Sequence, residues 1–76
     1  MNIAPLAERT ELLDNIGFIR RSIWACDSRD DQNLIIDLKI DLAITIYCLF
    51  HGGSIADGYQ AHGQGFIPQW FYDLAR

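Results

Sequence analysis

The chain has 76 residues, enough for one small domain and too few for a second hydrophobic core. Half of these residues are hydrophobic, which excludes an intrinsically disordered chain and predicts a single globular domain over residues 1–76. The formal net charge of −4, from ten acidic and six basic side chains, excludes the strongly basic character with which proteins usually bind nucleic acid phosphates, so direct nucleic-acid binding is not expected.

The first predicted element is a helix over residues 4–26. Its apolar residues recur at alternating spacings of four and three, which places them on one face: Leu12, Ile16, Ile19, Ile23 and Cys26. Pro5 suits the first helical turn, where its missing amide donor costs nothing. The apolar face should be buried, and Arg20 and Arg21 should face solvent or a partner.

Residues 27–33, DSRDDQN, are all polar and separate this helix from the next element. Asp30, Asp31 or Asn33 can accept hydrogen bonds from the free amides at the start of a second helix. A polar connection this short predicts that the elements on either side are antiparallel neighbours.

The stretch from 34 to 50, LIIDLKIDLAITIYCLF, contains thirteen apolar residues among seventeen and supports two interpretations. Apolar and polar residues alternate from Ile36 to Ile46, a pattern typical of a strand, which would give an α+β fold. On a helix, a narrow polar stripe lies instead opposite an apolar seam. The stripe is Asp37, Asp41, Thr45 and Cys48, and the seam is Ile35, Leu38, Leu42, Ile46 and Leu49. The length of the stretch and the Gly52-Gly53 stop favour a helix over residues 34–51.

The tail from residue 54 onward predicts two short helical segments. Ser54-Ile55-Ala56-Asp57 resembles a capping box, so a helix should run from Ile55 to His62. Pro68 suits the start of a last segment, QWFYDLA, which carries apolar residues at helical spacing. The predicted fold is therefore all-α: an antiparallel helical hairpin, about 4–26 and 34–51, with a shorter C-terminal helical segment packed across it.

The sequence predicts no metal or cofactor, because His51 and His62 stand eleven positions apart and no zinc-ligand spacing is present. Catalysis is not expected either. The only close cysteine and histidine, Cys48 and His51, lie three positions apart, and no oxyanion-hole feature accompanies them.

The two cysteines are predicted to be reduced thiols. The start of the chain lacks a basic segment followed by an apolar one, and residues 34–50 carry three charges in a run too short for a membrane span. We therefore expect a cytoplasmic protein. In the hairpin, the rise of about 21 Å from Leu34 to Cys48 keeps Cys48 beyond disulfide reach of Cys26. Cys26 should be a small core residue, and Cys48, on the polar stripe, should be partly accessible.

The most suggestive feature is a group of acidic residues within fifteen positions, offset only by Arg29 and Lys39: Asp27, Asp30, Asp31, Asp37 and Asp41. A solvated face with helix caps explains such a group without any function. The dense aromatic tail favours an interaction surface instead, with carboxylates that meet a basic protein and with Trp70, Phe71 and Tyr72 as anchors.

These features favour a non-enzymatic protein-binding protein that occludes a basic surface. One concrete version, by analogy of general type, is a small phage or mobile-element inhibitor of a host defence complex, such as an anti-CRISPR protein. The alternative is a structural or regulatory subunit that acts as a homodimer, since small apolar-rich chains often gain stability by association. A small enzyme that uses Cys48 and His51 comes third.

Overall fold

The structure, a computed structural model, describes residues 6–75 and contains four helices in that range and no strand. They are α1 (Leu6–Ala25), α2 (Gln32–His51), α3 (Ile55–Gly63) and α4 (Gln69–Leu74). The all-α prediction is confirmed, and the strand interpretation of residues 34–50 is wrong. The predicted helical residues 4 and 5 lie outside the described range.

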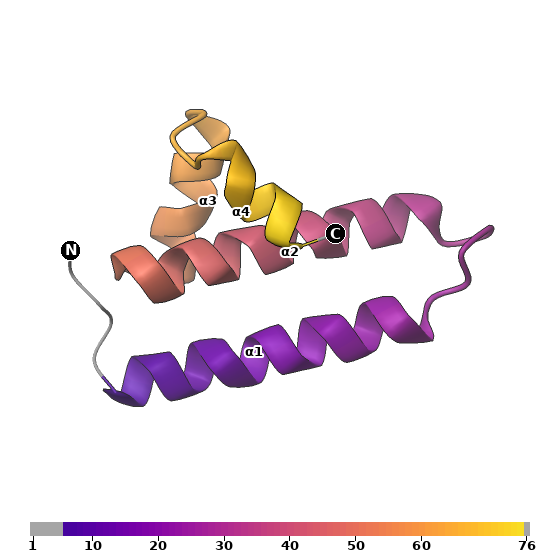
Figure 1. Ribbon diagram of the computed structural model, residues 1–76, viewed down its shortest axis with the longest axis horizontal. Coiled ribbons are helices and arrows are strands. Elements are labelled where there is room, and N and C mark those ends of the chain that lie inside the picture. The colour runs from indigo at the N-terminus through magenta and orange to yellow at the C-terminus, as the bar shows by residue number, and fades with distance from the viewer. Residues whose placement is uncertain (1–5, 76) are drawn as a thin grey trace.

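Helix α2 is the central element of the fold. It forms an antiparallel hairpin with α1, and α3 and α4 both pack on its C-terminal half (Figure 1). Five consecutive residues of α2 are buried, from Leu42 to Ile46. A helix that is apolar on all sides must be covered on all sides. This requirement explains the strand-like pattern, because the central turn of α2 has no solvent-facing side.

The hydrophobic core lies where the other helices meet α2. Helix α1 contributes Leu12, Ile16 and Ile19, as the apolar spacing predicts. Near the end of α1 the seam is less buried, since Ile23 and Cys26 are both only partly covered. The Cys26 thiol donates to the carbonyl of Ser22 over 3.1 Å. The prediction of Cys26 as a core residue is therefore wrong, because its side chain is only partly buried. The tail completes the core with three further buried residues: Ile67, Phe71 and Ala75.

The connection from α2 to α3 uses two glycines with positive φ, 76° at Gly52 and 88° at Gly53. This left-handed backbone costs glycine little and turns the chain sharply after the last helical turn. Ser54 and Asp57 then form the predicted capping box, in which each side chain accepts from the backbone amide of the other. The two local signals together direct α3 back over α2.

Helix α3 approaches α2 closely through Gly58. A Cβ atom at this position would lie 2.6 Å from Cys48 Sγ and 2.7 Å from Ile44 Cγ2. Both neighbouring side chains are fully buried. The contact covers the side of α2 that the sequence assigns to a polar stripe, so the prediction of a partly accessible Cys48 is wrong. Thr45 is buried as well.

Helix α4 is attached through Phe71, the largest fully buried side chain. Its ring lies edge-on to Tyr47, with 5.4 Å between centroids, and at a similar distance from His51. Trp70 stacks on it from outside at 3.9 Å. Complete burial of an aromatic side chain is worth about 2 to 3 kcal/mol. This single residue therefore supplies much of the energy that holds a six-residue helix.

Candidate interaction surfaces

The loop between α1 and α2 uses two of its carboxylates to form its own turn. Asp27 Oδ1 accepts hydrogen bonds from the amides of Arg29 and Asp30 at 2.8 and 3.0 Å. These two amides hold the pKa of the Asp27 carboxyl below its usual value. Asp31 Oδ2 accepts from the amide of Asp27 at 2.9 Å. Asp30 is exposed, and no hydrogen bond or ion pair of its carboxylate is recorded. Of the three predicted loop residues, Asp30 is the one left for a partner.

The predicted stripe on α2 separates into two parts. Asp37 is exposed and Asp41 is half-buried, whereas Thr45 and Cys48 face the core. Asp41 accepts a hydrogen bond from the hydroxyl of Tyr59 on α3. That bond, with some burial, raises the pKa of Tyr59 to about 12, because loss of the phenolic proton would place two negative charges together.

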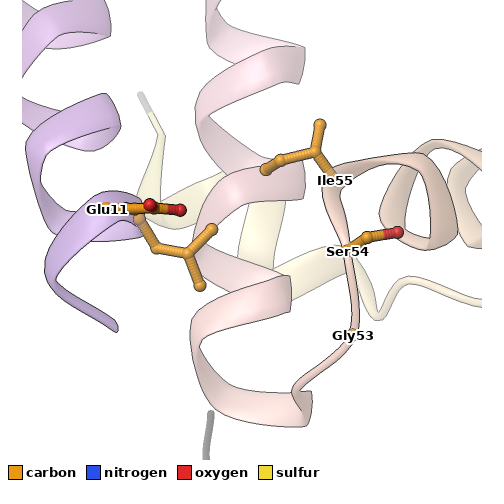
Figure 2. Close-up of a pocket in the computed structure, with 5 residues that line it drawn as sticks. Glu11, Gly53, Ser54 and Ile55 are labelled. Carbon is orange, nitrogen blue, oxygen red and sulfur yellow. The ribbon is translucent and has the colours of Figure 1, made fainter. Parts of the chain in front are cut away.

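A groove runs between α1 and the start of α3. Its lining residues are Glu11, Leu12, Gly53, Ser54 and Ile55, and they enclose about 440 Å³. Figure 2 shows the Glu11 side chain extending from α1 toward the α2–α3 connection. One turn further along α1, Asn15 donates to Thr45 Oγ1 over 3.2 Å and joins the two hairpin helices. We call Glu11, Asp37, Asp41 and Tyr59, which follow this side of the hairpin, the acidic flank.

A second groove lies on the other side of the hairpin, between α1, α2 and the end of α4. It encloses about 290 Å³ and is lined by Arg20, Ile23, Lys39, Leu42, Leu74 and Ala75. We call it the basic groove, because both of its charged residues are cations. No sequence pattern predicted this groove. The sequence holds one indication of it: Glu11 and Arg20 are nine positions apart, which places an acid and a base on opposite sides of one helix.

The three predicted aromatic anchors have different environments. Phe71 is wholly buried, so its assignment as an anchor is wrong for the folded chain. Tyr72 is partly buried, and its hydroxyl lies 2.6 Å from Nδ1 of His62. Trp70 is 52% exposed and leans on Phe50, with 6.5 Å between the ring centroids. Trp70 is therefore the anchor that faces solvent, and it lies on α4, away from Tyr59 on the acidic flank.

The cysteine and histidine side chains have separate surroundings. The Cys48 thiol, buried beneath α3, donates to the carbonyl of Ser54 over 3.4 Å, and burial raises its pKa. His51 stacks on Tyr47 with 4.3 Å between ring centroids, whereas His62 contacts Tyr72. Within residues 6–75 no three His, Cys, Asp or Glu side chains gather as a metal site would require. Both cysteines are free thiols.

None of the helices within residues 6–75 combines the length and the apolar character that crossing a membrane requires. Comparison of the chain with models of protein families, with curated proteins and with solved structures finds no match.

Proposed function

We propose that this chain is a non-enzymatic protein-binding protein whose acidic flank docks on a basic surface of another protein. The observation that carries the proposal is the combination of uncompensated carboxylates with exposed aromatic rings on one side of the hairpin. No hydrogen bond or ion pair is recorded for the side chains of Glu11 and Asp37, among the residues described. Tyr59 and Phe18 are exposed beside them, Phe18 being one turn from Asn15 on α1.

The proposed contact combines charge pairing with apolar contact. Carboxylates on the acidic flank pair with Lys and Arg of the partner, which guides encounter and sets the orientation. The exposed rings supply apolar contact at low entropic cost. A partner surface that normally holds nucleic acid phosphates has the required charge, and its occlusion would inhibit the partner. A small inhibitor of a host defence complex, of the anti-CRISPR type, is the concrete form of this proposal.

The proposal is tested by reversing one charge on the flank. We expect Asp37→Lys to weaken binding to a partner captured from the native host by about tenfold, because a close pair becomes a repulsion. The matched control is Asp14→Lys, an identical charge change at another exposed helix position without a recorded partner. Binding is measured by calorimetric titration with the purified partner, and thermal unfolding shows that both variants fold. Equal affinity of wild type and Asp37→Lys would exclude the acidic flank as the site.

A homodimeric structural subunit is the second candidate function. It is favoured by Leu34 and Ile36, which are exposed on the first turns of α2, where neither α3 nor α4 covers the helix (Figure 1). Its signature is a solution mass that stops rising at two chains and does not respond to a charge change at Asp37. Sedimentation equilibrium separates this outcome from the partner-binding proposal.

A further inference from the structure

The basic groove provides a surface of opposite character to the acidic flank. Arg20 is exposed at its edge and Lys39 is half-buried beside it. No hydrogen bond or ion pair is recorded for either side chain among residues 6–75. Ile23, Leu42 and Leu74 supply an apolar floor. The groove thus offers two unpaired cations around a hydrophobic centre, which is the arrangement that an acidic and aromatic protein surface would complement.

Apolar residues extend this surface along α4. Leu74 follows Trp70 by one helical turn, and Trp70 in turn contacts Phe50 on α2. All three are between 42% and 52% exposed. They form a continuous apolar strip from the basic groove toward the end of α2. Scattered exposed apolar residues are ordinary, but a continuous strip beside a groove is typical of an interaction site.

The acidic flank and the basic groove lie on different sides of the hairpin. Glu11 and Arg20 are nine positions apart on α1, which rotates them by about 180° around the helix axis. Asp41 and Lys39, two positions apart on α2, are separated by about 160° around the axis of that helix. In each of these two pairs the acid lies toward α3 and the base toward α4. Both helices of the hairpin therefore contribute to the charge separation.

We propose that the acidic flank of one copy of this chain docks in the basic groove of a second copy. The occupant is identified by complementarity of charge and apolar character: carboxylates with exposed rings on one side, cations around an apolar groove on the other. The contact joins unlike faces, so it is heterologous, and a dimer formed by it leaves one acidic flank and one basic groove free. Association therefore continues beyond two chains.

Self-association has a consequence for the function proposed above. It uses the same acidic flank, so a second copy and a basic partner exclude each other. This regulatory consequence rests on the proposed function, whereas the self-association does not. Measurements on the purified chain alone test the self-association, and titration with the partner tests the function. Either can fail without the other.

The first experiment is sedimentation equilibrium of the purified full chain at concentrations from about 10 µM to about 1 mM, where weak protein contacts become populated. We expect the average mass to rise continuously, without a plateau at two chains. A mass that stays at one chain throughout overturns the proposal. A plateau at two chains also overturns it, because that behaviour indicates a closed, symmetric dimer.

Two variants locate the contact. Arg20→Glu should weaken self-association at least about tenfold, because one close charge pair is reversed. Arg21→Glu makes the same charge change at the neighbouring position, whose guanidinium lies against Gly17, outside the residues that line the groove. It should leave association within about twofold of wild type, since an exposed charge outside the contact contributes little. Equal effects of the two variants would assign the loss to net charge alone and would refute the site.

Mixing experiments test the pairing of the two faces. Asp37→Lys should be as defective in self-association as Arg20→Glu, while Asp14→Lys should not be. An equal mixture of Arg20→Glu and Asp37→Lys should associate again, because one retains the acidic flank and the other the basic groove. Variants that had merely lost their fold would not recover on mixing, and circular dichroism checks each of them separately. A mixture that stays monomeric overturns the proposal.

Discussion

Replacement of Gly58 by alanine tests the packing of α3 on α2. The added methyl group would lie 2.6 Å from Cys48 Sγ and 2.7 Å from Ile44 Cγ2. Contacts this short force α3 away from α2, since both neighbours are buried and have no free space to enter. Overpacking of this kind costs about 1 to 3 kcal/mol. Alanine returns about 1 kcal/mol through its higher helix propensity.

The expected net loss for Gly58→Ala is therefore about 0 to 2 kcal/mol. A loss of about 1 kcal/mol, the middle of that range, lowers the melting temperature by about 4 to 8 °C in a domain of this size. Urea unfolding followed by circular dichroism gives the free energy of unfolding. The matched control is Gly63→Ala in the same helix, where a Cβ atom would meet nothing within 4 Å. That variant should be neutral or slightly more stable.

The double variant Gly58→Ala with Cys48→Ala separates the contact from other effects. Removal of the sulfur atom makes room for the new methyl group, so the added cost of Gly58→Ala should be smaller in the Cys48→Ala background than in the wild type. Equal changes in the free energy of unfolding for Gly58→Ala and Gly63→Ala would refute the close approach of α3 to α2, because only Gly58→Ala introduces the contact. A cost that is the same in both backgrounds would show that Cys48 is not the limiting neighbour.

Two further predictions concern titratable groups. Tyr59 should ionise near pH 12 in the folded chain, since its hydrogen bond to Asp41 raises its pKa. Asp41→Asn should return that pKa toward 10, and the absorbance of the phenolate measures the pKa in both proteins. Because the folded pKa exceeds the unfolded one, the bond contributes its full stability below pH 10 and loses it as the pH rises through 12. Cys26 should react with a thiol reagent at once and Cys48 only on unfolding, because Cys48 is 1% exposed and its pKa is raised. Mass spectrometry of the labelled chain counts the reacted thiols. Rapid labelling of both cysteines would contradict the burial of Cys48.

Local sequence patterns specify the helical elements and the hairpin. Spacings of three and four define the buried face of α1, and the polar loop 27–33 forces the next helix to return alongside it. Ser54 and Asp57 mark the start of α3, and Gly52 and Gly53 mark the end of α2. Each of these patterns acts within a few residues along the chain, so it specifies local structure without contacts from the rest of the molecule. The exposure of Asp30 and Asp37 follows from the same local patterns.

Which sides of α2 are covered depends on contacts between helices. Its central turn, Leu42 to Ile46, is buried on every side and includes the polar Thr45. No local pattern could therefore indicate that Cys48 and Thr45 face inward while Lys39 borders a groove. Those positions depend on Gly58, which admits α3 closely, and on Phe71, which draws α4 into the core. Contacts between residues far apart in sequence also placed Tyr59 on Asp41 and Leu74 beside Arg20. The acidic flank and the basic groove are therefore products of packing, because each gathers side chains from three helices.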